Sequence, residues 1–382
     1  MRHPQRNCRL ISMNAPDRDP RAEEAPAAAA ADVVVIGAGV VGSSIAFHLA
    51  ERGVDVLVID RNYPMSGTSG STQAWIWVHT KKPLFYAQFS MLSAELYPDL
   101  CRRIGDVEYE RTGGLSPLFD REHMKRAEGL AKGYSAAGLE VALVDRDQAL
   151  VIEPELSPGI LGATYSSIDG TVNPFRLVDA YVRAGIRLGA RYLFFNPVRA
   201  IDSVRNGFTI HAERTVIRAH RLVLAGGPYS PALGTMAGVE IPVFPVKGQI
   251  MVTEPLRPLL RHTLSGIRQT KNGEVLIGYS KENAGFDRLN THAVLRDTAR
   301  LAVRYVPALA DANLLRCFAG IRAIPADELP ILGAVPGRPG LYVAVLHSGF
   351  TLSPLIGTLM AELLTDGATS VEIDRYSISR FA

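Results

Sequence analysis

A glycine-rich segment near residue 40 constrains the fold of this chain more strongly than any other feature. Residues 31–36 (ADVVVI) are a continuous apolar run rich in β-branched side chains, which is typical of a strand buried on both faces of a parallel sheet. The run leads directly into Gly37-Ala38-Gly39-Val40-Val41-Gly42, a GxGxxG pattern. Glycines at this spacing let the backbone turn tightly, so that a pyrophosphate can approach the N-terminus of the following helix.

The residues after this turn complete a strand–helix–strand unit. Apolar side chains recur at helical spacing over residues 40–52, Gly53 ends the predicted helix, and residues 54–59 (VDVLVI) predict a second strand. Asp60 follows that strand, where a carboxylate can accept hydrogen bonds from the ribose hydroxyls of a dinucleotide. The unit therefore predicts a Rossmann-like dinucleotide-binding domain, although the motif alone does not distinguish NAD from FAD.

The composition argues against several classes of protein. The net charge is only +3, from 41 Lys and Arg against 38 Asp and Glu, and no dense basic cluster occurs, so nucleic-acid binding is not expected. The three cysteines are widely spaced and form no CxxC pair, which argues against a disulfide framework and a cysteine zinc site. We therefore expect no bound metal and a reducing, cytoplasmic location.

The N-terminal region predicts neither a membrane span nor a secretory signal. The longest apolar run, residues 27–42, contains Asp32 and several glycines, so a buried strand and turn is favoured over a membrane span. Residues 1–30 mix Arg, acidic residues, Pro and Ala without an apolar core. This mixture predicts a disordered tail.

The rest of the chain predicts two interleaved domains. Short apolar runs between residues 191 and 225 indicate a return to the first sheet, whereas residues 243–254 alternate apolar and polar side chains as antiparallel strands do. The predicted fold class is α/β, with an α+β second domain built on an antiparallel sheet. We divide the chain into a tail at 1–30, a dinucleotide-binding domain at 31–85, 165–242 and 317–382, and a substrate domain at 86–164 and 243–316.

Six segments occur in an order that identifies a family. They are GAGVVG with Asp60-Arg61, SGTSGSTQA (66–74), AGGPYS (225–230), VKGQI (246–250), AGIRAIPADELPILG (319–333) and HSGFTLSP (347–354). Over residues 32–382 the chain resembles the D-amino-acid oxidase, glycine oxidase and sarcosine oxidase β-subunit family of FAD enzymes. GSTQ followed by Trp77, together with HSGFTLSP, is most similar to the β-type subunits of opine oxidase and hydrogen cyanide synthase. The resemblance implies a Rossmann-like FAD-binding domain interleaved with the substrate domain.

The resemblance also implies which residues contact FAD. They are Gly37, Gly39, Val40, Val41, Gly42, Asp60, Arg61, Thr68, Ser69, Gln73, Ala74, Val198, Ala225, Gly226, Gly349, Phe350 and Thr351. The loop at 66–74 has an alternative interpretation as a solvated Gly/Ser linker. The flavin-linking cysteine that monomeric sarcosine oxidases carry near the position of Gly320 is absent, which implies non-covalent FAD, and Cys317 is expected to be a small buried hydrophobe.

Three residues are candidates for contact with the substrate. Arg322 occupies the position at which amino-acid-oxidising members of the family bind the substrate carboxylate, and a guanidinium can make a bidentate pair with it. His347 aligns with a position on the substrate side of the flavin, with a structural histidine at the turn as the alternative. Tyr279, together with Lys281, is expected to line the same pocket. The family's usual proline after the arginine is replaced here by Ala323.

The sequence therefore predicts an FAD-dependent oxidoreductase that oxidises the C–N bond of a small amino acid or secondary amine. The resemblance implies hydride transfer to flavin N5, followed by hydrolysis of the imine. The alternative is a non-catalytic or electron-relaying FAD subunit of a hetero-oligomeric dehydrogenase; an NAD(P) dehydrogenase is disfavoured by the AGG and HSGFT segments. The expected partners are the small substrate and an electron-accepting subunit, in an oligomer, with neither nucleic acid nor an integral membrane segment.

Overall fold

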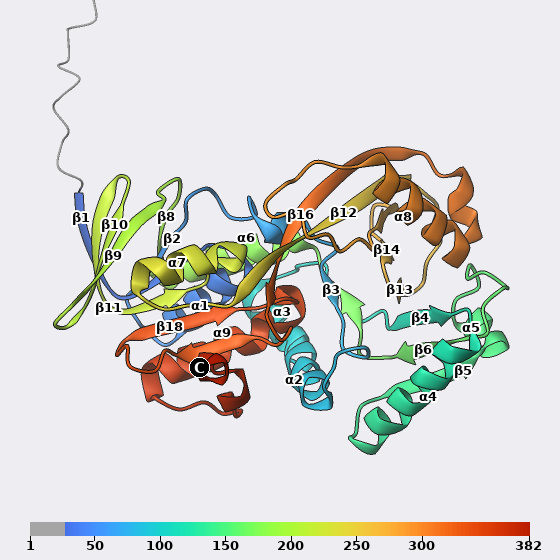
Figure 1. The fold of residues 1–382 in the computed structure, drawn as a ribbon, viewed down its shortest axis with the longest axis horizontal. Helices are drawn as coiled ribbons and strands as arrows, with labels where there is room; N and C mark the ends of the chain where they lie inside the picture. The colour runs from blue at the N-terminus through green and yellow to red at the C-terminus, as the bar shows by residue number, and fades with distance from the viewer. Residues whose placement is uncertain (1–26) are drawn as a thin grey trace, which may run out of the picture.

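The β-branched run before the glycine turn lies at the centre of a parallel sheet in the computed structural model, which describes residues 27–382. β1 (Ala27–Ile36) pairs in parallel with β2 (Val56–Ile59) and with β11 (Thr215–Leu224) (Figure 1). Val33, Val34 and Val35 are fully buried, so both faces of β1 are covered, as the sequence predicts.

The sequence-based start of β1 was placed too late. Residues 27–30, which the prediction assigned to the tail, pair with residues 215–218 of β11. The local sequence could not reveal this pairing, because the partner strand lies almost 190 residues further along the chain. The rest of the predicted tail, residues 1–26, lies outside the described residues.

The first sheet is mostly parallel and has eight strands. Its order is β17-β18-β11-β1-β2-β8, and a β9–β10 hairpin extends from β11. The strands not yet defined are β8 (Arg191–Leu193), β9 (Val198–Val204), β10 (Gly207–Ala212), β17 (Ile331–Ala334) and β18 (Leu341–Val345). Because β1, β11 and β18 run in parallel, their carboxyl ends meet at one edge of the sheet.

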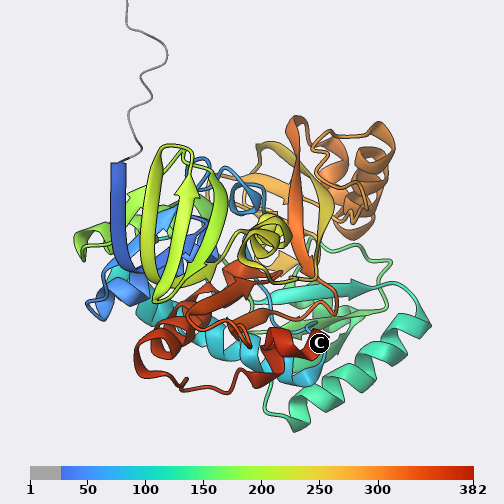
Figure 2. The same cartoon turned by 60° about the vertical axis from the view of Figure 1, so that its left-hand side comes forward.

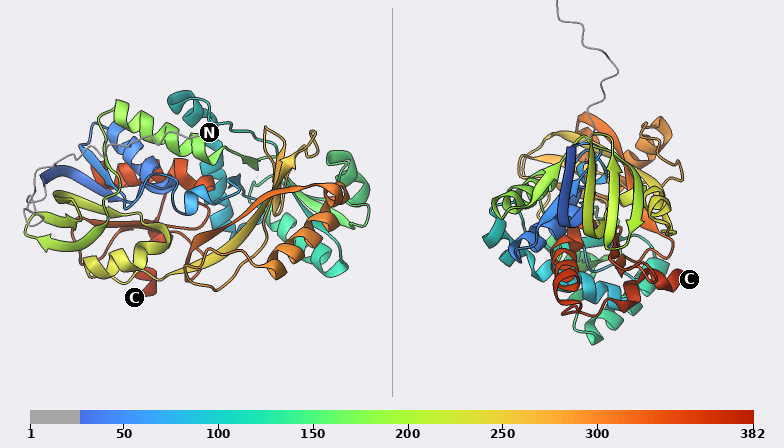
Figure 3. Two further views of the ribbon diagram at one scale, coloured as in Figure 1. Left: turned by 90° about the horizontal axis from the view of Figure 1, so that it is seen from above. Right: turned by 90° about the vertical axis from the view of Figure 1, so that its left-hand side faces the viewer.

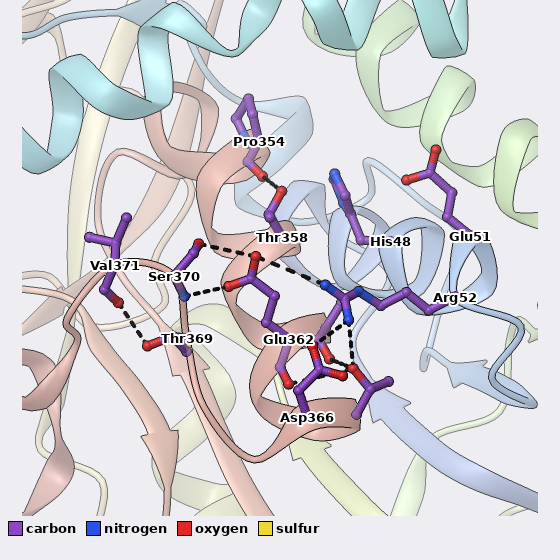
Figure 4. Close-up of polar contacts among 12 residues, drawn as sticks. His48, Glu51, Arg52, Pro354, Thr358, Glu362, Asp366, Thr369, Ser370 and Val371 are labelled. Carbon is purple, nitrogen blue, oxygen red and sulfur yellow. Dashed lines mark hydrogen bonds and ion pairs between the residues drawn. The ribbon is translucent and has the colours of Figure 1, made fainter.

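Two helices pack side by side on one face of this sheet. α1 (Val40–Glu51) follows β1, and α9 (Gly349–Asp366) follows β18. The Ser44 hydroxyl of α1 donates to the Ser353 carbonyl of α9 at 2.7 Å. At the other end of the pair, Arg52 binds Asp366 at 2.7 Å, as the close-up in Figure 4 shows. The N-termini of both helices therefore lie at the same edge of the sheet.

The remaining elements around the first sheet cover its two faces. α6 (Pro174–Arg187) packs against α1, and α7 (Ser230–Ala237) contributes Leu233 to the core on the opposite face. α2 (Leu84–Glu95) packs against α9. α2 ends before Leu96, and a second helix, α3 (Tyr97–Ile104), has Pro98 in its first turn, because proline cannot donate the hydrogen bond that would continue α2.

The second sheet also has eight strands and is almost entirely antiparallel. Its order is β16-β12-β15-β14-β13-β4-β6-β5, with a parallel pair between β13 and β4. Its strands are β4 (Gly114–Leu118), β5 (Val141–Asp145), β6 (Gly162–Ser166), β12 (Val243–Pro255), β13 (Thr263–Leu264), β14 (Ile267–Gln269), β15 (Glu274–Ile277) and β16 (Leu314–Pro325). β3 (Trp75–Ile76) and β7 (Gly170–Thr171) form a separate short pair.

Figures 2 and 3 show this sheet beside the first one, with its own helices on the outside. These helices are α4 (Arg121–Ala136), α5 (Arg146–Ile152) and α8 (His292–Tyr305). The α/β fold with a second, antiparallel sheet is confirmed. The predicted domain division places a boundary at residue 317, which lies inside β16. The domain boundaries stay a prediction. Among residues 27–382, no helix is long and apolar enough to span a membrane.

The third glycine of the motif gives a test of the turn geometry. A Cβ atom added at Gly42 would lie 1.9 Å from the carbonyl oxygen of Gly37, whereas one added at Gly39 would meet only the Ser69 hydroxyl, at 3.2 Å. We expect Gly42→Ala to lower the free energy of unfolding by about 1–3 kcal/mol, because a backbone atom must move to relieve the clash. Urea unfolding of the full chain measures this, with Gly39→Ala as the matched control. Equal losses in the two variants would contradict the prediction.

Candidate active site

The glycine turn after β1 lies directly against a second turn, at residues 225–227. Gly37 has a φ of +118°, and a Cβ atom added there would lie 2.4 Å from the carbonyl oxygen of Ala225. Gly37 also donates its N–H to the Ile59 carbonyl at 2.8 Å. Only glycine lets the two turns come this close, so Ala225 and Gly226 border the same space as Gly37.

The N-terminus of α1 opens into this space. Its N-cap is Gly39, which has no side chain to cap the helix, and its first turn contains no acidic residue. The Ser69 hydroxyl accepts the N–H of Val40 at 3.0 Å, which brings the loop at 66–74 against the helix. The first-turn N–H groups of a helix and its dipole stabilise an anion, so this end of the space suits a phosphate.

Asp60 holds the same turn from the end of β2. Its Oδ2 atom accepts the N–H of Ala38 at 2.8 Å, and its Oδ1 atom accepts the N–H of Asn62 at 2.8 Å. A carboxylate has further lone pairs, so ribose hydroxyls can still donate to it. The neighbouring Arg61 stacks on Tyr229, with 3.5 Å between the guanidinium carbon and the ring centroid.

The N-terminus of α9 opens into the space from the neighbouring strand. Its N-cap, Ser348, has a φ of +65° and makes no side-chain cap, and the first turn again contains no acidic residue. Thr351 accepts the N–H of Trp77 and donates to the Trp75 carbonyl, both at 3.1 Å. The hydroxyl of Thr351 is therefore used to hold β3 against α9, while residues 349–351 line the space.

The loop at 66–74 joins the two sheets and is not a solvated linker. Thr68 donates to the Ile321 carbonyl of β16 at 2.5 Å, and the Gln73 amide donates to the Gly266 carbonyl at 2.9 Å. Gln73 and Ala74 are buried. The Thr68 and Gln73 side chains hold the second sheet beside the first, so the loop forms one wall of the space between the two sheets.

Together these segments enclose a cavity of about 870 Å³. The cavity is lined by every residue that was predicted to contact FAD or the substrate, except Gly42. Gly42 lies behind the turn, where the absence of a side chain makes room for the Gly37 carbonyl. The lining residues from the prediction are Gly37, Gly39, Val40, Val41, Asp60, Arg61, Thr68, Ser69, Gln73, Ala74, Val198, Ala225, Gly226, Tyr279, Lys281, Arg322, His347, Gly349, Phe350 and Thr351.

Arg322 lies on β16 of the second sheet and lines the same cavity as the two helix N-termini. Its Nη1 atom donates to the Ser280 carbonyl at 2.9 Å and, more weakly, to the Lys247 carbonyl at 3.4 Å. The guanidinium packs on the bare backbone of Gly248, where an added Cβ atom would lie 2.2 Å from Nη1. Burial lowers the pKa of Arg322, although the charge of Glu282 opposes the effect.

His347 and Tyr279 line the cavity with Arg322. Burial, reinforced by the charges of Lys81, Arg322 and Lys281, lowers the pKa of His347 well below its usual value, so the imidazole is neutral at physiological pH. Burial raises the pKa of Tyr279, which keeps its hydroxyl protonated, and that hydroxyl has no hydrogen-bond partner among residues 27–382. Tyr279 therefore offers a free donor or acceptor.

The structure adds Lys81, which sequence reasoning missed. Lys81 lines the cavity, donates to the Ser348 hydroxyl, and lies 5.2 Å from the ring centroid of Tyr86. Burial lowers its pKa to about 8, against the opposing charges of Asp169 and Glu328. Its position after the aromatic segment WIWVHT was the available signal, but nothing in the sequence distinguishes it from the neighbouring Lys82.

A buried hydrogen-bonded pair, His79 and Asp169, lies beside Trp77 near Lys81. His79 binds Asp169 through Nδ1, and its Nε2 atom is 3.1 Å from the Thr164 hydroxyl. Asp169 also accepts the N–H of Val78 at 2.7 Å. The His79 ring lies 4.5 Å from that of Trp77, so the pair fixes the orientation of this tryptophan. In the described part of the chain, no group of three His, Cys, Asp or Glu residues is arranged to hold a metal ion.

Comparisons with known proteins agree with this geometry. A family model described as FAD dependent oxidoreductase (DAO) matches residues 32–363. The HcnC subunit of hydrogen cyanide synthase from Pseudomonas protegens is 31% identical, with 92% of this chain and 96% of that protein covered. The B subunit of opine oxidase from Agrobacterium tumefaciens is 30% identical, with 92% and 97% covered.

The fold of most of the chain also matches a solved structure. The crystal structure of glycine oxidase from Geobacillus kaustophilus superimposes with a TM-score of 0.87 at 28% identity, over 92% of this chain and 99% of that one. The family match over most of the chain, together with the glycine turn and the two open helix N-termini, leads to one conclusion: the chain belongs to the DAO family of FAD-dependent oxidoreductases.

Proposed function

We propose that this protein oxidises the C–N bond of a small amino acid or secondary amine that carries a carboxylate. The observation that carries the proposal is Arg322, which lines the cavity. Its guanidinium donates only to main-chain carbonyls and forms no ion pair with any described residue. A partly buried guanidinium without a carboxylate partner is a suitable site for a substrate carboxylate.

The cavity also fits the cofactor of the family. The bare turn at Gly37 and Gly39 and the open N-terminus of α1 suit a pyrophosphate, and the N-terminus of α9 suits the electron-rich edge of a reduced flavin. When bound, FAD supplies the acceptor for the hydride. No cysteine lines the cavity in the described part of the chain, which supports non-covalent binding.

The residues of this chain then orient the substrate. Arg322 holds the carboxylate, which fixes the neighbouring carbon for hydride transfer. His347, being neutral, can accept a hydrogen bond from the amine without repelling an ammonium ion. Tyr279 supplies a further hydroxyl that no described residue binds. The relatives named as a glycine oxidase and as an opine oxidase act, by their names, on amine-containing acids, which supports this substrate class.

Anaerobic reduction of the flavin tests the proposal. The FAD-loaded protein is mixed with glycine, sarcosine, proline and N-carboxyalkyl amino acids, and loss of the flavin absorbance is followed. We expect at least one of these compounds to bleach the flavin. If dithionite bleaches it but no amine does, the proposal is wrong, and the better assignment is a non-catalytic or electron-relaying FAD subunit.

Arg322→Ala should reduce kcat/KM for the best substrate by about 30-fold to several thousand-fold. Removal of the charged partner of a buried substrate carboxylate costs about 2–5 kcal/mol of binding free energy. Arg322→Lys should recover only part of the loss, because an ammonium cannot reproduce the planar fork. Steady-state kinetics and FAD content are measured together.

Arg338→Ala is the matched control for Arg322→Ala, because Arg338 also donates to a main-chain carbonyl, that of Gly238, but lies outside the cavity. If Arg322→Ala lowers the melting temperature but keeps kcat/KM within about threefold of wild type, Arg322 has a structural role alone.

The neutral state of His347 predicts a pH profile. Its pKa is lowered from 6.5, so protonation occurs only at more acidic pH than for a free histidine. We therefore expect kcat/KM to show no inflection from His347 between about pH 6 and 8, and His347→Gln to leave the shape of the profile in this range unchanged. An inflection near pH 6.5 that disappears in His347→Gln would contradict the prediction.

We also propose that electrons leave the flavin through a partner subunit of a cytoplasmic complex. The printed names of the HcnC protein and of the opine oxidase relative mark both as subunits, which supports this assignment. The isolated chain should then reduce an artificial dye much faster than it produces hydrogen peroxide. Equal rates of peroxide formation and dye reduction would show that oxygen is the direct acceptor.

A further inference from the structure

A proline inside α9 leaves one carbonyl of the helix without its usual donor. In an α-helix each carbonyl accepts the N–H of the residue four positions later. For Phe350 that residue is Pro354, labelled in Figure 4, which has no N–H although the helix runs through it. Phe350 is buried, so its carbonyl needs a partner from outside the helix; a buried carbonyl without one costs about 1–3 kcal/mol.

Tyr97 supplies this partner. It is the first residue of α3, its side chain is fully buried, and its hydroxyl donates to the Phe350 carbonyl. The ring stacks on that of Tyr109, with 4.9 Å between the centroids, which fixes the direction of the hydroxyl. Burial raises the pKa of Tyr97 well above its usual value, so the hydroxyl keeps the proton that it donates.

The peptide group that Tyr97 binds belongs to the open end of α9. The carbonyl of Phe350 and the N–H of Thr351 are the two ends of one peptide unit, and in a helix the N–H points toward the N-terminus. Residues 349–351 line the cavity, and their N–H groups donate to no described residue. A hydrogen bond to a carbonyl polarises its peptide unit and makes the N–H a stronger donor. Tyr97 can therefore act on the cavity without lining it.

The first turns of α9 are also held by other elements. The hydroxyl of Thr351 binds β3, and the Ser93 hydroxyl of α2 accepts the N–H of Leu355 at 3.2 Å. These contacts do not involve Tyr97, so loss of its hydroxyl should leave the helix in place. The expected change is local, in the direction and polarity of the peptide between residues 350 and 351.

We propose that Tyr97 is a positioning residue for the flavin: its bond to the Phe350 carbonyl orients and polarises the first turn of α9 and raises the reduction potential of bound FAD. The open N–H groups of this turn favour negative charge, and a reduced flavin carries more of it than an oxidised one. Pro354 makes the protein dependent on this bond. The inference rests on the proposed placement of the flavin at α9, and it does not depend on the substrate.

Tyr97→Phe tests the proposal because it removes the hydroxyl and keeps the ring. The reduction potential of the FAD-loaded full chain is measured anaerobically against a reference dye, together with FAD content and melting temperature. We expect the ratio of the affinities for reduced and oxidised flavin to fall by about fivefold or more. This corresponds to a fall of about 20 mV or more in the two-electron potential.

Tyr181→Phe is the matched control. The Tyr181 side chain is also fully buried, and its hydroxyl lies 3.2 Å from the Ser353 hydroxyl of the same helix. This variant removes a buried tyrosine hydroxyl from α9 without changing the partner of the Phe350 carbonyl. It should lower the melting temperature, as Tyr97→Phe does, but keep the affinity ratio within about twofold of wild type.

Pro354→Ala tests why the bond is needed. It returns an N–H to the position four residues after Phe350, so the carbonyl gains a donor within the helix. In this background Tyr97→Phe should change the affinity ratio by less than about twofold. If Tyr97→Phe alone does not fold, the double variant should fold and bind FAD. Failure of both variants to fold would show that Tyr97 has a different structural role and would overturn the proposal.

A change below about fivefold in Tyr97→Phe would also overturn it, as would an equal change in Tyr181→Phe or in the Pro354→Ala background. None of these measurements uses an amine. If amines bleach the flavin but the potential does not depend on Tyr97, only the positioning role is wrong. If the potential depends on Tyr97 but no amine bleaches the flavin, only the proposed function is wrong.

Discussion

Two parallel helix dipoles meet at one cavity, and the rest of the site is arranged around that contact. α1 and α9 follow strands of the same sheet and lie side by side, joined by the bond from Ser44 to Ser353. An added Cβ atom at Gly357 would lie 2.2 Å from the Ser44 hydroxyl, so a glycine is needed for the helices to approach this closely. Parallel dipoles repel each other, and an anion at their common positive end relieves the repulsion. Neither helix supplies an acidic first turn, so the ligand has to provide the negative charge.

The second sheet completes the site because a few side chains hold it against the first. Thr68 and Gln73 donate to carbonyls of the second sheet region, while Thr351 holds β3 against α9. Positive charge is thereby distributed over both halves of the cavity, through the dipoles on one side and Arg322 on the other. The cavity attracts anions along its whole length, which is appropriate for a dinucleotide next to an acidic substrate.

Much of the first sheet could be predicted from sequence because its signals are local. The run at 33–35 and the glycines at 37 and 39 encode a buried strand and a tight turn within a few residues. The start of α9 is harder to predict, because proline disfavours a helix interior, whereas this helix begins at Gly349 and includes Pro354. The six family segments predicted the residues that line the cavity, and their individual roles stay predictions.

Features made by distant residues could not be predicted in the same way. His79 and Asp169 are 90 positions apart, and nothing near either residue indicates the other. Lys81 is distinguished by its burial and by its contact with Ser348, and both depend on segments far from it in the sequence. The strands of the second sheet between residues 114 and 166 are five residues long each, and their buried positions do not alternate regularly, so their sequence signal is weak beside that of β1.

The pairing of β1 with β11 and of β11 with β18 affects how the protein is made. β2 follows β1 closely along the chain, but Val35 pairs on its other side with Val223, and Leu224 of β11 pairs with Val343, so one edge of β1 emerges from the ribosome long before its partner strand exists. At a synthesis rate of roughly 5–20 residues per second, the delay is on the order of tens of seconds. During this time an apolar strand edge is exposed, and the nascent chain depends on chaperones or on temporary contacts to avoid aggregation. The wall of the cavity formed by the start of α9 is complete only after residues 349–351 have been released, so the site is finished late in biosynthesis.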